Sequence, residues 1–303
     1  MGPSPTSARS DVLYDTWDDT SCDVSTFTCT NGLPVSHSTD GGRTWSLSYA
    51  DRISQDPNGC SFAQYIGAQP LVDPKNGTLY VAAEKLAVTD TGCTFDQPLV
   101  RSQVVFRSTD GGTTFGPATT IATVTPATPQ GALDLGDGKF IRTIEFPTLA
   151  LAGGSLYAAW NDGANGNSHV RIARSSDGAA SWSTSWVTTG SGDELQPSLT
   201  ASKSGLHVLY YQRNNDNTLD VAEASGTNGA GWTTSLVSSQ SFPGVVTVPQ
   251  FDPQIGFGYM GDYLGSATDG TKTFYAWGDN RNTLTNFTHP SGRHDPDVYF
   301  AKK

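Results

Sequence analysis

A turn-forming octapeptide recurs along this chain and restricts its fold more than any other sequence feature. Good copies begin at Ser38, Ser108 and Ser175, and a fourth begins at Ser225 with Thr227 in place of the aspartate. The shared pattern is S-x-D-x-G-x-x-W/F. Aspartate accepts hydrogen bonds from neighbouring backbone N–H groups and glycine tolerates positive φ, so each copy predicts a tight hairpin turn sealed by an aromatic ring. Recurrence at intervals of tens of residues predicts a repeat architecture.

The segments between these turns follow one order: P-x-L, turn, apolar–aromatic strand, polar loop, strand, octapeptide and strand. Complete repeats open at residues 69–73, 145–150 and 196–199. The first repeat lacks an inner strand, and the last, residues 261–301, lacks an outer one. A unit of four antiparallel strands is typical of a propeller blade. The sequence therefore predicts an all-β fold, a β-propeller with five recognisable blades and room for a sixth.

Length and charge narrow the range of partners. The 303 residues fit one all-β domain, which we expect over residues 11–303 after a disordered leader at residues 1–10. Because no apolar run reaches 18 residues, no membrane-spanning helix is expected. The formal net charge of −11 argues against a nucleic-acid partner, which would require a basic surface. We expect the protein to act as a monomer.

The four cysteines fall into two local pairs along the sequence. Four cysteines allow three pairings, which the sequence alone does not distinguish, and buried free thiols are the alternative. We expect disulfides Cys22–Cys29 and Cys60–Cys93, because each closes a short or blade-sized loop. Disulfides are typical of oxidising compartments, so they indicate a secreted or extracytoplasmic protein.

Aromatic and acidic residues end the second strand of several repeats. Three similar phrases are Trp17-Asp18-Asp19, Trp160-Asn161-Asp162 and Trp277-Gly278-Asp279. Aromatic rings stack on the apolar face of a sugar and carboxylates accept its hydroxyl protons, so such a ring of residues favours a glycan partner. Repetition of the blade by itself is the alternative explanation. The candidate substrate-binding residues are Arg213, Arg281, Asp279, Asp162, Trp17, Trp160 and Trp277.

Metal and lyase chemistry are less well supported by the sequence. Carboxylates could hold a structural calcium ion, but no D-x-D-x-D-G loop is present, so we predict no metal site and no cofactor. A lyase would require a base beside a group that neutralises a uronate carboxylate. The candidate bases would be His169, His207, His289 and His294, although lone histidines are more often structural or exposed.

The octapeptide resembles the Asp-box, or bacterial neuraminidase repeat, of the sialidase superfamily. A further likeness, to secreted sialidase-like proteins of bacteria, depends on the segments Phe146–Ala150, Gly261–Gly265 and Trp277–Arg281. The resemblance implies a six-bladed propeller with the Asp-boxes on its outer rim, far from the central site. It also implies retaining cleavage of a terminal sialic acid by a tyrosine nucleophile with a glutamate base, an aspartate acid/base and three carboxylate-binding arginines.

The resemblance assigns these roles to particular residues. Tyr263 takes the nucleophile position and Arg213 that of one carboxylate-binding arginine. The glutamate of the family's E-P-S motif falls at Gln196, which cannot act as a base, so Glu194 is the candidate base. The candidate acid/base residues are Asp23 and Asp19.

The chain also departs from the sialidase pattern. The N-terminal F-R-I-P motif has no counterpart, and no arginine lies between Arg213 and Arg281, where the third would be expected. Arg142 is a further candidate for binding a substrate carboxylate, with a surface role as the alternative.

Two classes of function follow from these observations. A secreted glycoside hydrolase acting on a terminal sugar predicts that Tyr263, Glu194 and Asp23 or Asp19 converge on the mouth of the channel, with Arg213 beside them. A non-catalytic lectin or adhesin, which binds carbohydrate or protein, predicts aromatic pockets without a nucleophile–base contact.

Overall fold

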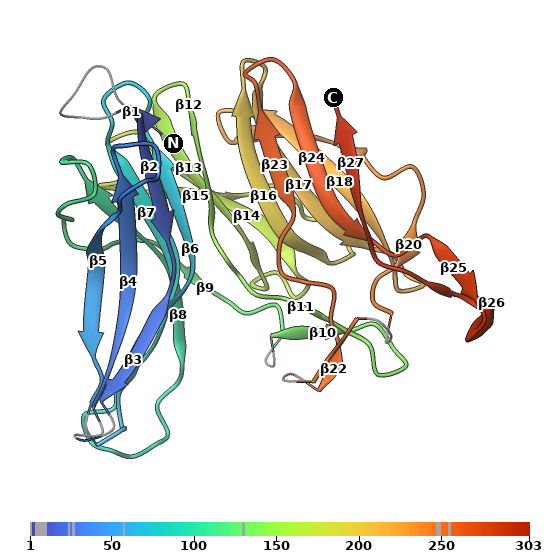
Figure 1. The fold of residues 1–303 in the computed structure, drawn as a ribbon, viewed down its shortest axis with the longest axis horizontal. Helices are drawn as coiled ribbons and strands as arrows, with labels where there is room; N and C mark the ends of the chain where they lie inside the picture. Colours follow the sequence, from blue (N-terminus) through green and yellow to red (C-terminus); the bar gives the residue numbers. More distant parts are fainter. Residues whose placement is uncertain are drawn as a thin grey trace. The chain divides into compact units, whose positions relative to one another are not determined.

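The computed structural model describes residues 2–3, 11–23, 25, 28–56, 58–128, 131–246, 250–253 and 256–303. Within them the chain is all-β, with no helix (Figure 1). Two compact units are distinguished, and each is described by itself. Unit 1 comprises residues 1–124, 146–151 and 175–183, and unit 2 comprises residues 125–145, 152–174 and 184–303. In the described ranges no helix is long and apolar enough to cross a membrane. The expected leader, apart from residues 2–3, lies outside the described residues.

The first sheet of unit 1 is built around one long strand, β4 (Thr28–Ser38). Strands β2 (Asp11–Thr16) and β3 (Asp19–Asp23) pair with it in succession, and β5 (Ser46–Ser54) pairs along its length. The short strand β1 (Gly2–Pro3) pairs with β2. A disulfide joins Cys22 and Cys29, which face each other across β3 and β4, so this pairing is confirmed.

The second sheet of unit 1 is the four-stranded antiparallel meander expected of a complete repeat. It comprises β6 (Phe62–Val72), β7 (Leu79–Val88), β8 (Val100–Ser108) and β9 (Thr119–Val124). The second predicted disulfide, Cys60–Cys93, is also confirmed and links the segment before β6 to the loop after β7. Residues of alternate strand positions from both sheets form one apolar core, which includes Leu33, Val35, Leu79, Val81 and Phe106.

Consecutive strands form further sheets later in the chain. The sheet β12-β13-β14-β15 comprises β12 (Thr148–Ala152), β13 (Ser155–Asp162), β14 (His169–Ser175) and β15 (Ser183–Trp186). The next comprises β16 (Glu194–Ser202), β17 (Gly205–Arg213), β18 (Thr218–Thr227) and β19 (Ala230–Leu236), with β20 (Phe242–Pro243) on β18. Among the described residues the last sheet has three strands, β23 (Gly265–Thr268), β24 (Thr273–Asp279) and β27 (Asp297–Lys302), as the incomplete final repeat led us to expect.

Three short hairpins of unit 2 lie outside these sheets. They are β10 (Ala132–Asp134) with β11 (Phe140–Arg142), β21 (Phe251–Asp252) with β22 (Phe257–Gly258), and β25 (Thr283–Asn286) with β26 (His289–His294). The first two lie in the long connections that precede β12 and β23. The core of unit 2 contains Leu195, Leu209, Tyr211, Tyr275 and Trp277.

The good copies of the octapeptide form one repeated turn. In the first, Oδ1 of Asp40 accepts hydrogen bonds from the backbone N–H groups of Arg43 and Thr44, both at 2.9 Å. The Ser38 hydroxyl donates to the same oxygen at 2.8 Å and accepts from the N–H of Gly42 at 2.9 Å. Asp110 and Asp177 organise their turns in the same way, so the tight turn expected from the pattern is present three times.

The fourth copy folds differently because it lacks the aspartate. Thr227 remains in β18 and pairs with Ala230, which leaves only Asn228 and Gly229 in the turn. Both have positive φ, +54° and +78°, as a type I′ hairpin requires. Without a carboxylate to collect the N–H groups of a longer loop, the strands continue into a two-residue turn.

We expect the three aspartate turns to make the protein sensitive to acid. The pKa of Asp40 is lowered to about 2, chiefly by the hydrogen bond from the Thr44 N–H, and that of Asp177 to about 2, chiefly by the Ser181 hydroxyl. Burial opposes the shift at Asp110, yet the hydrogen bonds of Thr114 and its neighbours still lower this pKa to about 2. Because these values lie below those of an unfolded chain, the turns contribute stability above about pH 4 that is lost as the pH falls towards 2.

Urea unfolding at pH 5, 3 and 2 tests this expectation. The control is a triple variant with asparagine at positions 40, 110 and 177, which does not titrate at these sites. The difference in free energy of unfolding between the wild type and the variant should shrink as the pH falls. An equal difference at pH 5 and pH 2 would contradict the prediction.

Candidate active site

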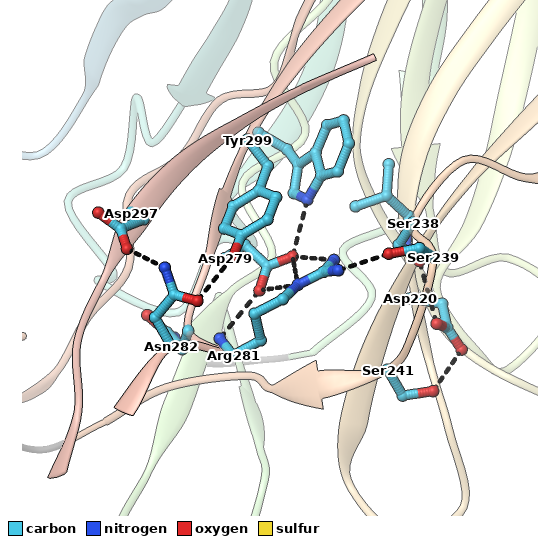
Figure 2. Close-up of polar contacts among 12 residues, drawn as sticks. Asp220, Ser238, Ser239, Ser241, Asp279, Arg281, Asn282, Asp297 and Tyr299 are labelled. Atoms are coloured by element: carbon cyan, nitrogen blue, oxygen red, sulfur yellow. Dashed lines mark hydrogen bonds and ion pairs between the residues drawn. The ribbon is translucent and has the colours of Figure 1, made fainter. Parts of the chain in front are cut away.

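The carboxylate of Asp279, at the end of β24, is held on two sides. The Trp277 Nε1–H donates to its Oδ2 at 3.1 Å, and the Arg281 guanidinium donates through Nε at 3.0 Å and Nη2 at 2.5 Å. Figure 2 shows the Arg281 side chain between Asp279 and Ser239, whose hydroxyl accepts from Nη1 at 2.7 Å. The guanidinium also lies 4.3 Å from the centre of the Tyr299 ring. The hydrogen bonds to Asp279 raise the pKa of Arg281.

The other Trp-x-Asp phrase of unit 2 forms the same kind of clamp. The Trp160 Nε1–H donates to Oδ2 of Asp162 at 3.1 Å, and Arg171 reaches the same oxygen at 3.2 Å. Trp160 and Asp162 are both fully buried. In each sheet the clamp ties the aspartate at the end of the second strand to an arginine, Arg171 of β14 in one case and Arg281 just after β24 in the other. These internal contacts account for the two phrases without a ligand.

Glu194 and Arg213, the predicted base and carboxylate-binding arginine, both have internal partners. Oε2 of the buried Glu194 lies 2.6 Å from His169 Nδ1 and accepts from the Thr188 hydroxyl at 2.9 Å. Burial raises the pKa of Glu194 against the effect of these bonds. Arg213 donates to Asp193 at 3.0 Å and to the Asn217 side chain at 2.7 Å.

The remaining predicted residues are divided between the two units. Asp19 and Asp23 lie on β3 of unit 1, where Oδ1 of Asp23 accepts from the N–H of Ser25 at 2.8 Å. Trp17, in the same unit, is 40% exposed. Tyr263 belongs to unit 2 and is 62% exposed. The convergence of these residues on one site stays a prediction.

Sequence reasoning largely missed a polar cluster within unit 2 that joins two long connections. Arg142 Nη1 lies 3.1 Å from Oδ2 of Asp262, and the Tyr259 hydroxyl donates to the same oxygen at 2.6 Å. Arg142 also donates to the Tyr259 oxygen at 3.5 Å, with its guanidinium 5.5 Å from the centre of the ring. Burial, followed by the hydrogen bond to Asp262 and then by the charge of Asp262, raises the pKa of Tyr259 to about 12. The other oxygen of Asp262, Oδ1, is buried and has no hydrogen-bond partner among the described residues.

Gln196 fixes this cluster from the inner strand β16. It occupies a bulge between the pairs Leu195–Tyr211 and Ser198–Leu209, with φ at +52°. Its side-chain amide donates to the carbonyls of Gly261 at 2.9 Å and Arg142 at 3.3 Å, one in each connection. A positive φ is strained for a residue with a side chain and is often found at functional sites.

The equivalent bulge in β6 of unit 1 has a glycine at the position of positive φ. That bulge lies between the pairs Ile66–Glu84 and Gln69–Ala82, and its residue of positive φ is Gly67. A Cβ atom at Gly67 would lie 2.2 Å from the Phe146 ring, so glycine is needed there. Gln196 instead keeps its side chain at the cost of strain, and that side chain holds Arg142 and Asp262 in place.

The two connections lie outside the repeat pattern, which explains why this cluster was hard to predict. Residues 125–147 and 237–264 are long connections between successive sheets, and such loops carry function more often than strands do. The sequence analysis gave Arg142 as a candidate carboxylate-binding residue, and Asp262 lies in the sialidase-like segment Gly261–Gly265. Tyr259 was missed. The sequence feature that could have pointed to it is its position four residues before Tyr263.

The arrangement can support proton transfer at a phenol. A carboxylate 2.6 Å from a tyrosine hydroxyl is within the distance required of a general base, and the guanidinium beside it can stabilise negative charge. Arg142 is about one-third exposed, so the cluster is reachable from solvent. In the described residues, no group of three or more His, Cys, Asp or Glu side chains is placed to hold a metal ion.

Comparison with known proteins finds structural neighbours of low sequence identity. No family model matches the chain, and no curated protein matches it. The NanB sialidase of Streptococcus pneumoniae is similar in structure, with 10% identity and a TM-score of 0.49 over 93% of this chain and 60% of NanB. The α-L-arabinofuranosidase Arb93A of Fusarium graminearum matches with 12% identity and a TM-score of 0.41, over 98% of this chain and 95% of that one. The chain thus spans less than two thirds of the length of NanB.

Proposed function

We propose that this chain is a secreted glycoside hydrolase that removes a terminal sugar from a glycan, on a β-propeller whose blades are the antiparallel sheets described above. The observation that carries the proposal is the hydrogen bond from Tyr259 to Asp262, with Arg142 against both groups. Two disulfides support an oxidising location, and the three aspartate turns support the likeness to Asp-box propellers.

In the proposed reaction Tyr259 is the nucleophile. Its oxygen attacks the anomeric carbon while Oδ2 of Asp262 takes the phenolic proton, so the glycosyl–tyrosine bond forms as the glycosidic bond breaks. A neutral phenol approaches an anionic sugar with less repulsion than a carboxylate would. Water then cleaves the glycosyl–tyrosine bond, and the phenol recovers its proton. Arg142 would bind an anionic or electron-rich group of the substrate. The leaving oxygen takes its proton from solvent water, and the water that attacks in the second step returns a proton to solvent, so the overall reaction balances as hydrolysis.

This proposal differs from the sequence prediction in the choice of tyrosine. Tyr263 was placed at the nucleophile position by resemblance, whereas Tyr259 is the tyrosine with a hydrogen bond to Asp262. Tyr263 directly follows Asp262 and is well exposed, which suits an aromatic residue that stacks on the sugar.

A panel of 4-methylumbelliferyl glycosides, including the sialoside, tests the function with the wild type and two matched variants. Tyr259→Phe should lower kcat/KM on the order of 10³-fold or more, because it removes the nucleophile. Tyr263→Phe, which keeps the ring, should retain most of the activity. The reverse result would move the nucleophile to Tyr263. If both variants keep their activity, a tyrosine mechanism is excluded. If the wild type hydrolyses none of the glycosides in the panel, the hydrolase proposal is overturned.

A non-catalytic propeller that binds carbohydrate or protein is the second candidate. The internal pairing of Glu194 and Arg213 favours it, because the base and the carboxylate-binding arginine predicted for a sialidase are already occupied. Binding on a glycan array by a wild type that hydrolyses nothing on the panel would support this alternative.

A further inference from the structure

A pocket of about 470 Å³ lies within unit 1, on one face of the β6–β9 sheet. Its floor contains Lys85 of β7 and its register partner Ser102 of β8, together with Val104 and its partner Thr120 of β9. Side chains at such positions point to the same face of a sheet. The volume is in the range of small-molecule sites in proteins.

The loop between β7 and β8 contributes a second wall and is held in shape independently of any ligand. The disulfide Cys60–Cys93 ties this loop to the segment before β6. The buried Asp90 anchors it further, because its Oδ2 accepts from the N–H of Phe95 at 2.6 Å and its own N–H donates to the Ser61 hydroxyl at 2.8 Å. Gln97 and Pro98 of this loop line the pocket. A preformed wall lowers the entropy lost when a ligand binds.

Lys85 is the single charged residue among those that line the pocket. Within the part of the chain that is described, it makes no ion pair, and its ammonium lies 5.9 Å from the centre of the Tyr65 ring. A partly enclosed cation without a protein partner is suited to an anionic group of a ligand.

The other lining residues indicate the chemistry of the rest of that ligand. Val100, Val104 and Pro98 are apolar, and the polar ones, such as Ser102 and Thr120, are neutral. None of the described residues that line the pocket is aromatic, so these residues provide no stacking surface of the kind that sugars favour. The pocket therefore suits a ligand with a compact apolar body and one negative charge.

We propose that this pocket binds a small monocarboxylate with an apolar body, held by an ion pair with Lys85. The site is distinct from the cluster around Asp262, and all its lining residues belong to unit 1. It requires no glycosidase activity, so the two proposals succeed or fail separately.

Isothermal titration of the full chain with three probes that share a cyclohexane ring tests the charge requirement. Cyclohexanecarboxylate should bind, whereas the neutral cyclohexanecarboxamide and the cationic cyclohexylamine should bind at least about tenfold more weakly, since a charge-assisted hydrogen bond is lost. Glucuronate, which has the charge but a polar body, should also bind more weakly. Tighter binding of glucuronate or of the amide than of cyclohexanecarboxylate would overturn the proposal, as would failure of cyclohexanecarboxylate to bind.

Two variants and one control locate the site. Lys85→Met keeps the length of the side chain and removes the charge, so binding of cyclohexanecarboxylate should fall at least about tenfold. Ala118→Trp fills the pocket from its exposed rim on the chain before β9 and should abolish binding without a change in charge. Lys75→Met, in the exposed turn between β6 and β7, is the matched control and should bind as the wild type does. Unchanged binding by both Lys85→Met and Ala118→Trp would place the ligand elsewhere and refute this site.

Discussion

Replacement of Arg281 by methionine should lower the free energy of unfolding by about 3–5 kcal/mol, because it leaves a buried carboxylate without its cation. Asp279 is fully buried, and Arg281 donates to both of its oxygens (Figure 2). The bonds that remain come from the Trp277 indole and from the backbone N–H of residue 281, and these neutral donors cannot replace the guanidinium. The measurement is equilibrium unfolding in guanidinium chloride.

Arg293→Met provides the matched control for this change. Arg293 pairs with Asp295 at 3.2 Å, but the two side chains are 28% and 34% exposed. Water screens such a pair, so its loss should cost less than about 1 kcal/mol. An equal decrease in the free energy of unfolding for Arg281→Met and Arg293→Met would show that the burial of Asp279 does not determine the loss of stability.

Asp262→Asn should reduce kcat/KM of the proposed hydrolase about 10²–10⁴-fold, the usual contribution of a general base. Asparagine keeps the shape of the side chain and can still accept hydrogen bonds from Arg142 and Tyr259, but it cannot take the phenolic proton. Loss of the negative charge should also lower the pKa of Tyr259 from about 12, since the charge of Asp262 contributes to that shift.

Absorbance titration of the tyrosines provides a readout of this second effect. Because unfolding would also lower the pKa of every buried tyrosine, the circular dichroism spectrum of Asp262→Asn must match that of the wild type over the same pH range. A tyrosine that ionises near pH 12 in the wild type should ionise at lower pH in Asp262→Asn. Asp269→Asn, in the exposed turn between β23 and β24, is the control and should change neither activity nor titration. Activity of Asp262→Asn within threefold of the wild type would exclude the carboxylate as the base.

Local patterns in the sequence predicted the elements whose cause is local. The three aspartate turns form because carboxylate, hydroxyl and glycine lie within one octapeptide, so no distant residue is needed. The two disulfides join cysteines that are close in sequence or bracket one hairpin. The fourth copy of the octapeptide, where Thr227 extends β18 into a type I′ turn, shows how one absent carboxylate changes that outcome.

The chemistry of the candidate site was beyond such patterns. Whether Asp279 faces a ligand or Arg281 depends on how deeply the end of its strand is buried. In the structure, Asp279 pairs with Arg281 and Asp162 pairs with Arg171. The contact of Arg142 with Asp262 joins residues separated by 120 positions, through two connections that follow no repeat. By itself, the sequence determined an all-β chain of repeated hairpins with two disulfides, because those features depend on neighbours along the chain. Only the tertiary structure decided which polar groups are satisfied internally and which meet at Asp262, because that depends on how separate loops pack around Gln196.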